Sequence, residues 1–287
     1  MRYYRRRVEG ERSLVAADGD AVYDLTAVRP ELRGFGDLAR AAAVADVGVD
    51  DVAERHLDAA PTLGGVPDDL ATPLTAPEVW AAGVTYRISE EAREDESGMP
   101  ELYLDVYDAE RPELFLKATP ARTVGPGGDV GVRADSDWDV PEPELGVVLY
   151  RGDVVGYTAG NDVSSRDIEG ANPLYLPQAK VYDRCCALGP AVASPSTVGD
   201  PHDLALSMTI ERDGERVYEG EASTGDMVRR CEDLVEWLTA HDELPDLTVL
   251  LTGTSLVPPD EFTLREGDRV RITLESVGTL TNGVTEV

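Results

Sequence analysis

The stretch PEPELGVVLYRG (141–152) decides how this sequence is interpreted, because it sets two glutamates just before an apolar run typical of a β-strand. Side chains two residues apart in a strand point to the same face, so Glu142 and Glu144 should lie side by side. Few Lys or Arg residues stand nearby in the sequence. If that face is buried, a divalent cation is the expected neutraliser, and two solvated surface carboxylates are the simpler alternative.

A third carboxylate follows in GYTAGNDVSSRDIEG (156–170), where Asp162 comes at the end of another strand-like run. An Asp after Asn can cap a turn, which is one interpretation. The other is that Asp162 completes a group of three carboxylates with Glu142 and Glu144. Such a group of oxygen ligands suits Mg²⁺, with Mn²⁺ or Ca²⁺ as substitutes.

The composition is strongly acidic. The chain has 287 residues and a net charge of −30, with a pI of about 4.3. This charge argues against nucleic acid or an anionic membrane as a partner, because both require a basic surface. The acidic residues are spread along the whole chain, which favours a halophilic cytoplasm where salt screens self-repulsion, over a merely well-solvated surface.

The cations are 24 arginines and only two lysines, Lys117 and Lys180. Lysine has a tunable pKa that arginine cannot offer, so their retention indicates a chemical role for at least one of them. Chance or a buried ion pair is the alternative. Beside a divalent cation the pKa of Lys180 should be lowered, which would make this residue a general base.

The cysteines and the apolar runs exclude several classes of protein. Three cysteines, two of them adjacent and none in a Cys-x-x-Cys motif, support neither a disulfide framework nor a zinc site. No segment approaches 18 apolar residues, and the basic N-terminus lacks a following apolar stretch. We therefore expect a soluble, cytoplasmic protein.

The order of predicted elements indicates two domains. Short strands joined at Asp18-Gly19-Asp20 and a helical region at 34–60, interrupted at Gly48, are followed by a Pro- and Gly-rich segment at 61–78. We place a boundary near residue 72, between a small N-terminal domain (1–72) and a mainly β domain (73–287). One helix is predicted within 225–243, with Asp226 as its N-cap and Met227, Cys231, Leu234, Val235 and Leu238 on its buried face.

These motifs together resemble the fumarylacetoacetate hydrolase superfamily. The resemblance runs from GVTYRISEEAR (83–93) through EPELGVVL, GYTAGNDVSSRD and the lysine of NPLYLPQAK to residues 251–284. It implies an α+β, mainly β fold: a mixed β-roll catalytic domain preceded by a small N-terminal α/β domain. It also implies that Glu142, Glu144 and Asp162 hold Mg²⁺ and that Lys180 lies beside the substrate.

One departure from the family pattern bears on the reaction. Hydrolases of this family carry a His a few residues after the Tyr of a G-x-x-Y motif, and here the aligned position is Ser89. The three histidines, His56, His202 and His241, fall outside every motif. Without that His, a hydrolytic water loses its activator, whereas a metal and a lysine suffice to remove a proton next to a carbonyl.

The segments AERPELFLKATP and NPLYLPQ look like the sugar-acid branch of the superfamily, the archaeal 2-dehydro-3-deoxy-pentonate dehydratases. This resemblance implies a small 2-oxo sugar acid (arabinonate or xylonate) as substrate and Mg²⁺-dependent conversion to 2,5-dioxopentanoate in oxidative pentose degradation. Lys180 would remove a C3 proton, and Glu113 would protonate the departing C4 hydroxyl. Relatives of this kind form homodimers or homotetramers.

Further residues are expected at the substrate: Arg87, Lys117, Thr85, Tyr175 and Thr254. Lys117 binds substrate or neutralises the two glutamates, and Arg87 grips the substrate carboxylate or makes a surface salt bridge. Glu113 could instead pair with Lys117 or Arg111. Gly253 either lets backbone amides approach an anion or turns the chain at a strand end.

Two other functions stay open on the sequence. One lies within the superfamily, a hydrolase of acylpyruvate-like acids or an oxaloacetate decarboxylase. The other is a non-catalytic cation-binding protein, against which the retention of two lysines in a lysine-poor chain argues.

Overall fold

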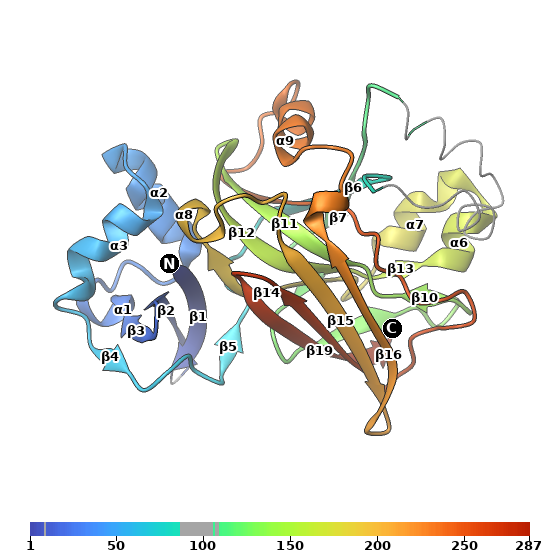
Figure 1. The fold of residues 1–287 in the computed structure, drawn as a ribbon, viewed down its shortest axis with the longest axis horizontal. Helices are drawn as coiled ribbons and strands as arrows, with labels where there is room; N and C mark the ends of the chain where they lie inside the picture. The colour runs from blue at the N-terminus through green and yellow to red at the C-terminus, as the bar shows by residue number, and fades with distance from the viewer. Residues whose placement is uncertain (9, 87–105, 107–108) are drawn as a thin grey trace.

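The structure, a computed structural model, describes residues 1–8, 10–86, 106 and 109–287. Two large sheets dominate that part of the chain, and the helices lie around them (Figure 1). The fold is mainly β with helices, as the sequence predicts.

The N-terminal part has three consecutive antiparallel strands with helices packed beside them. Its elements are β1 (Arg2–Val8), β2 (Glu11–Asp18), β3 (Ala21–Asp24), α1 (Leu25–Val28), α2 (Phe35–Ala45) and α3 (Val49–Leu57). The predicted turn joins β2 to β3, and the predicted interruption at Gly48 separates α2 from α3, with Gly48 as the N-cap of α3. A capping Gly and the acidic residues Asp50 and Asp51 in the first turn favour this start of α3.

The segment predicted as a linker carries two short strands. They are β4 (Thr62–Leu63), which pairs with β3, and β5 (Leu70–Ala71), which pairs with β1. Strand β1 also pairs with β14 (Cys186–Ala193), so the N-terminal strands continue the large sheet. The boundary near residue 72 stays a prediction.

The large sheet carries the strands that matter for the site. Its order is β4-β3-β2-β1-β14-β12-β11-β17-β6-β7, with β5 and β8 (Thr123–Val124) paired at its side. The strands next to the site are β12 (Asp153–Asp162), β11 (Pro143–Tyr150), β17 (Leu247–Leu251), β6 (Glu78–Gly83) and the edge strand β7 (Glu113–Ala118). Strand β11 is buried along its whole length because β12 and β17 flank it.

A second sheet packs against the first. Its order is β16 (Glu215–Ser223), β15 (Ala205–Arg212), β18 (Arg269–Leu274), β19 (Gly278–Glu286) and β9 (Asp129–Val132). A small third pair joins β10 (Asp139–Val140) to β13 (Ser164–Ser165). The remaining described elements are α6 (Arg166–Ala171), η1 (Pro173–Tyr175), α7 (Leu176–Lys180), α8 (Pro195–Val198), η2 (Thr224–Asp226) and α9 (Cys231–Thr239).

The pleat of β11 divides its side chains between two apolar clusters. Leu145, Val147 and Leu149 join residues of the second sheet and α9 in one cluster, whereas Val148 and Tyr150 face the N-terminal helices in the other. The even-numbered residues of this strand therefore share one face, which is the face that the sequence assigns to both glutamates.

Helix α9 begins later than predicted. The sequence places its N-cap at Asp226, but the helix begins at Cys231 after Arg230, and Asp226 ends the short turn η2. Met227 instead forms an isolated β-bridge with Tyr86. The periodic apolar pattern includes Met227 and therefore predicts that the helix contains it. The pairing of Met227 with Tyr86 outweighs that local preference. Among the described residues, no helix is long and apolar enough to cross a bilayer.

The buried centre of β11 should dominate stability. We expect Leu145→Ala to lower the free energy of unfolding by about 2–5 kcal/mol, because a fully buried leucine leaves a cavity between two close-packed sheets. Val217→Ala, on the exposed strand β16, should change it by less than about 1 kcal/mol. Urea titration of both variants measures this difference, and equal losses would contradict the assignment of β11 to the core.

Candidate metal centre and active site

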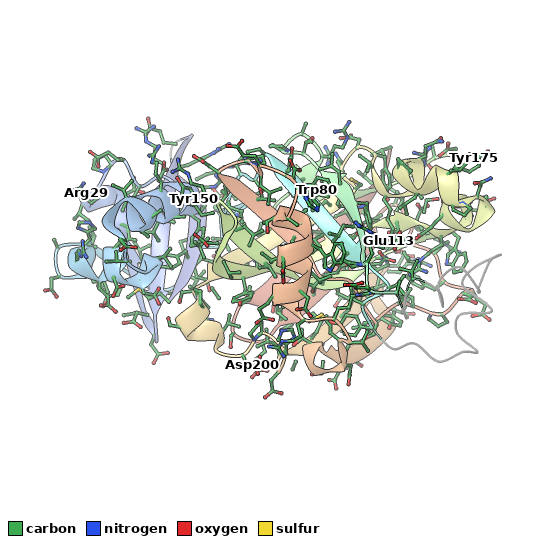
Figure 2. The ribbon with its side chains drawn as sticks, turned by 90° about the horizontal axis from the view of Figure 1, so that it is seen from above. Arg29, Trp80, Glu113, Tyr150, Tyr175 and Asp200 are labelled. Atoms are coloured by element: carbon green, nitrogen blue, oxygen red, sulfur yellow. The ribbon has the colours of Figure 1, made fainter. Side chains whose placement is uncertain are left out.

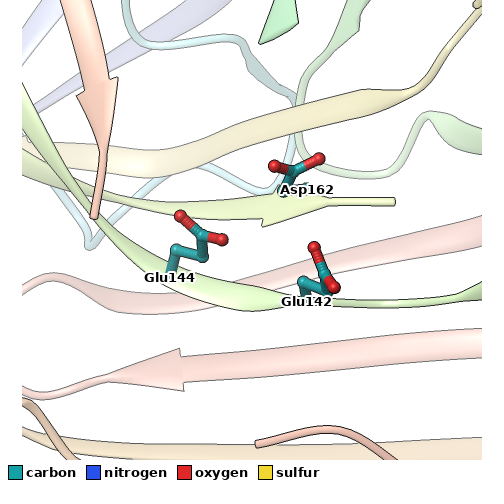
Figure 3. Close-up of side chains that lie close together, drawn as sticks. All are labelled: Glu142, Glu144 and Asp162. Atoms are coloured by element: carbon teal, nitrogen blue, oxygen red, sulfur yellow. The ribbon is translucent and has the colours of Figure 1, made fainter. Parts of the chain in front are cut away.

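Three carboxylates meet in the interior where β11 begins and β12 ends. Glu142, Glu144 and Asp162 each offer an oxygen, and these oxygens lie within 4.8 Å of one another (Figure 3). All three residues are buried. The structure thus brings together the three residues that the sequence proposes as metal ligands.

Strand pairing explains this placement. In the antiparallel ladder Glu144 faces Gly160, and the amide of Asp162 donates to the carbonyl oxygen of Glu142 at 2.9 Å. Asp162 therefore lies beside Glu142 across the ladder, while Glu144 follows on the same face of β11 (Figure 3). The side-chain oxygen of Asn161 accepts from the amide of Glu142 at 3.1 Å and fixes the start of the strand.

More cations surround these carboxylates than the neighbouring sequence indicated. Glu142 pairs with Lys180 and Arg166, each at 2.7 Å, and Lys117 lies 2.5 Å from Asp162 Oδ1. The sequence led us to expect few Lys or Arg residues near the carboxylates. That expectation is wrong for the folded protein, because all three cations come from segments that lie further along or far away in the sequence.

The cations do not compensate the three carboxylates equally. Burial raises the pKa of Glu142, but Lys180 and Arg166 outweigh it and hold the pKa at about 2. Burial, and then the charges of Asp162 and Glu142, raise the pKa of Glu144 well above its usual value. The hydrogen bond from the Gly253 amide lowers it, but by less. Burial also raises the pKa of Asp162, which Lys117 only partly offsets. The charged forms of Glu144 and Asp162 are therefore disfavoured, and a nearby positive charge would stabilise them.

The donors fit a hard divalent cation. All three ligands are carboxylates, and Asp162 Oδ2 is buried without a hydrogen-bond partner among the described residues. Glu144 Oε2 accepts the amide of Gly253 at 2.7 Å, which leaves Oε1 available. An all-oxygen site of this kind suits Mg²⁺ and offers nothing to a metal that prefers sulfur or imidazole.

Lys180 is the last residue of α7 and reaches directly to this group. Its Nζ donates to Glu142 Oε2 at 2.7 Å and to Ser164 Oγ at 2.6 Å, and it lies 3.8 Å from Glu169 Oε2. Burial lowers the pKa of Lys180, but Glu142, Glu169 and Asp162 together raise it well above its usual value. Without a cation the contacting carboxylates therefore dominate, and the lowered pKa that the sequence predicts beside a bound cation stays a prediction.

Lys117 lies beneath the carboxylates and does not line the cavity above them. It is completely buried, and besides Asp162 its Nζ donates to the carbonyl oxygens of Val163 at 2.7 Å and Lys180 at 2.5 Å. Its carboxylate partner is Asp162, whereas the sequence proposed the two glutamates or the substrate.

Glu113, the first residue of β7, lines the same cavity as Lys180 and the three carboxylates. Figure 2 shows it at the edge of the large sheet. Burial and then the charge of Glu169 raise the pKa of Glu113 to about 6. No described ion pair joins Glu113 to Lys117, and Arg111 stacks on Trp237 at 4.5 Å, so the structural pairings suggested by the sequence do not form among the described residues.

The other expected substrate residues fall in different places. Thr85 and Thr254 line the cavity, and Thr85 Oγ1 donates to the carbonyl oxygen of Thr252 at 2.6 Å. Tyr175 is 44% exposed in η1 and is not among the described lining residues (Figure 2). Arg87 and the position of Ser89 lie outside the described residues.

The conformation of Gly253 shows which of its two expected roles it has in the turn TGTS (252–255). Its φ of +84° is in the left-handed region, and a Cβ there would lie 2.2 Å from Thr85 Oγ1. This close approach lets the Gly253 amide reach a buried anion, which is the carboxylate of Glu144.

Sequence reasoning missed two functional positions in α6. Arg166 pairs with Glu142, and Glu169 lines the cavity with a buried Oε2 that has no hydrogen-bond partner among the described residues. Their spacing of three residues places both on one face of a helix that follows Asp162, and that was the available signal.

Comparison with known proteins agrees with this fold and site. Residues 78–285 match the family described as fumarylacetoacetate (FAA) hydrolase C-terminal. A probable 2-keto-3-deoxyxylonate dehydratase of Haloferax volcanii is 58% identical over the full length of both chains. The 2-dehydro-3-deoxy-D-arabinonate dehydratase of Saccharolobus solfataricus is 43% identical over 216 residues, which cover 74% of this chain and 72% of that protein.

A solved structure supports the same relationship. A 2-keto-3-deoxy-D-arabinonate dehydratase complexed with magnesium and 2,5-dioxopentanoate has a TM-score of 0.85 and 32% identity, and the match covers 100% of this chain and 99% of that one. The chain belongs to the fumarylacetoacetate hydrolase family.

The carboxylate group can be tested by metal binding. We expect Glu144→Gln to weaken Mg²⁺ binding by about tenfold or more, because affinity follows the number of charged ligands. Asp183→Asn, an exposed substitution that removes one charge elsewhere, should leave binding unchanged. Calorimetric titration of both variants with Mg²⁺ measures this difference. Equal Mg²⁺ affinity of the two variants would contradict the assigned ligands.

The raised pKa of Glu113 predicts a pH dependence. A carboxyl group whose folded pKa is about 6, above an unfolded value of about 4.5, stabilises the fold below the lower value and loses this contribution as pH rises through the higher one. We expect about 2 kcal/mol of unfolding free energy to be lost across this window. Glu113→Gln should flatten the decline in denaturant titrations, and an unchanged slope would contradict the shift.

Proposed function

We propose that the protein is a Mg²⁺-dependent dehydratase that converts 2-dehydro-3-deoxy-D-pentonate (arabinonate or xylonate) to 2,5-dioxopentanoate. The observation that carries this proposal is one cavity lined by three carboxylates, a lysine and a carboxyl of raised pKa. The two relatives named as dehydratases and the solved dehydratase that holds 2,5-dioxopentanoate support the substrate class.

Glu142, Glu144 and Asp162 would hold the cation. When bound, Mg²⁺ would supply positive charge that stabilises the negative charge developing on a 2-oxo acid. The fixed strands β11 and β12 hold the carboxylates in place before substrate arrives, so little reorganisation is needed.

Lys180 is our candidate for the base. Its Nζ lies at the cavity and is oriented by Ser164 Oγ, which itself donates to Glu142 Oε2 at 2.9 Å. In the reaction the amine would take a C3 proton from the substrate, which requires a neutral lysine. Carboxylates that contact Lys180 oppose that state, and a cation on Glu142 would weaken their influence.

Glu113 is our candidate for the acid. A pKa of about 6 leaves a useful fraction of the carboxyl protonated near neutral pH. Its proton would leave with the C4 hydroxyl as water, which leaves a C3=C4 double bond. Removal of a proton from C5 and return of a proton to C3 would then give the C4=C5 enol. Ketonisation of that enol yields the C5 aldehyde of 2,5-dioxopentanoate.

The chief competing reaction is hydrolysis or decarboxylation of an acylpyruvate-like or oxaloacetate-like acid. None of the described residues lining the cavity is a histidine. His56 lies in α3, His202 lies 3.2 Å from Glu232, and His241 lies beyond the end of α9. This arrangement favours proton removal over activation of a hydrolytic water.

We further propose a salt-rich cytoplasm and a homo-oligomeric state, dimer or tetramer. The acidic composition and the Haloferax volcanii relative support the first. For the second, Leu174 is 83% exposed beside the half-exposed Tyr175, an apolar pair that a second copy could cover. The division into domains 1–72 and 73–287 remains part of the proposal.

Incubation of the purified protein with 2-keto-3-deoxy-pentonate and Mg²⁺ tests the activity. We expect a C5 aldehyde, and its absence together with turnover of acylpyruvates or oxaloacetate would replace the dehydratase with the competing reaction. No turnover of any of these acids, with Mg²⁺ bound, would identify a non-catalytic cation-binding protein.

Lys180→Ala should lower kcat by about 100-fold or more while Mg²⁺ still binds, because the variant removes a general base and no proposed ligand. Arg151→Ala, a surface variant of a residue paired only with Asp246 among the described residues, should keep full activity. Unchanged kcat in Lys180→Ala would refute its role as the base.

A further inference from the structure

A second cavity, of about 530 Å³, lies where the N-terminal part meets the large sheet. Arg5, Arg12 and Arg33 line it together with the start of helix α2 and Leu247 of β17. It shares no lining residue with the cavity of the carboxylate group, so the proposed reaction does not use it.

Arg5 is a buried cation without a carboxylate partner among the described residues. The residue is 6% exposed, and its hydrogen bonds among the described residues go to a hydroxyl and a backbone carbonyl. Its Nη1 donates to Thr75 Oγ1 at 3.0 Å and its Nη2 to the carbonyl oxygen of Leu74 at 3.4 Å. Its buried Nε finds no hydrogen-bond partner in the part of the chain that the structure describes. A guanidinium withdrawn from water in this way normally requires an anion.

The start of α2 adds positive potential at the same place. Gly34 is the N-cap, and no side chain caps the helix. The first amides of an α-helix lack intrahelical acceptors and carry the positive end of the helix dipole. Arg5 packs against this terminus, since a Cβ on Gly34 would lie 3.4 Å from Arg5 Cδ and 3.5 Å from Arg5 Nη1.

Two carboxylates also line the cavity, but they do not pair with Arg5. Asp37 accepts from the amide of Arg33 and from Arg40 Nη2, both at 3.1 Å, and Glu11 is exposed. The pKa of Arg5 is lowered to about 10, by burial and then by Arg12 and Arg7, with Asp37 opposing. The local field is therefore positive on a chain whose net charge is −30.

We propose that this cavity binds a small oxyanion, the phosphoryl or carboxylate group of a free metabolite, through Arg5 and the N-terminus of α2. Arg12 and Arg33 at its rim would add charge-assisted contacts. Because β17 also pairs with β11, which carries Glu144, an occupied site would brace the sheet that holds the carboxylate group.

The test is binding of inorganic phosphate to the full chain at fixed ionic strength and fixed Mg²⁺. We expect saturable binding by calorimetry and a rise in melting temperature, both weakened about tenfold or more in Arg12→Ala and in Arg33→Ala. Both arginines are exposed, so these variants should fold, whereas the buried Arg5 is less suited to removal.

Three controls make the result specific. Arg216→Ala removes an exposed arginine of β16 and should bind phosphate normally. Lys180→Ala should also bind normally, which separates this site from the carboxylate group and from the proposed reaction. Acetate in place of phosphate distinguishes a carboxylate ligand from a phosphoryl one. No saturable binding of either anion, or equal weakening in Arg216→Ala and Arg12→Ala, would overturn the proposal.

Discussion

Mutual repulsion among three buried carboxylates is the constraint on which the rest of this structure depends. Glu142 and Glu144 cannot move apart, because β11 is hydrogen-bonded to strands on both sides and packed on both faces. Asp162 is tied to the same ladder by its amide. Burial and then this repulsion raise the pKa values of Glu144 and Asp162, and a cation would favour their charged forms.

The two lysines pair with different carboxylates: Lys117 with Asp162, and Lys180 with Glu142. An ammonium group presents three donors from one point, and Lys117 directs them to Asp162 and to two backbone carbonyls. A planar arginine fork has a different donor geometry, which gives a physical reason for lysine at this position in an arginine-rich chain. One of those carbonyls belongs to Lys180, so Lys117 also fixes the end of α7 that carries Lys180.

Local patterns in the sequence were enough for most of the strands and for the shared face of the two glutamates. These local patterns did not predict features that depend on contacts between segments distant in the sequence. Strand β14 was missed because CALGPAVA has Gly189 and Pro190 in its middle, which read as punctuation rather than as a buried strand. The contacts of Lys180 with Glu142 and Glu169, which raise its pKa, are set by tertiary packing and could not be predicted from local patterns. Spacing alone likewise gave no reason to leave Tyr175 on the surface.

The burial of both lysines has a consequence for chemical labelling. Lys117 is wholly buried, and Lys180 is 6% exposed and lines the cavity that the carboxylates share. The outer surface therefore offers no lysine side chain to acylating reagents or to enzymes that modify lysine. Labelling of a lysine in this protein would therefore report that the reagent has entered the cavity that Lys180 lines. The absence of other lysines makes Lys180 a selective probe of the site.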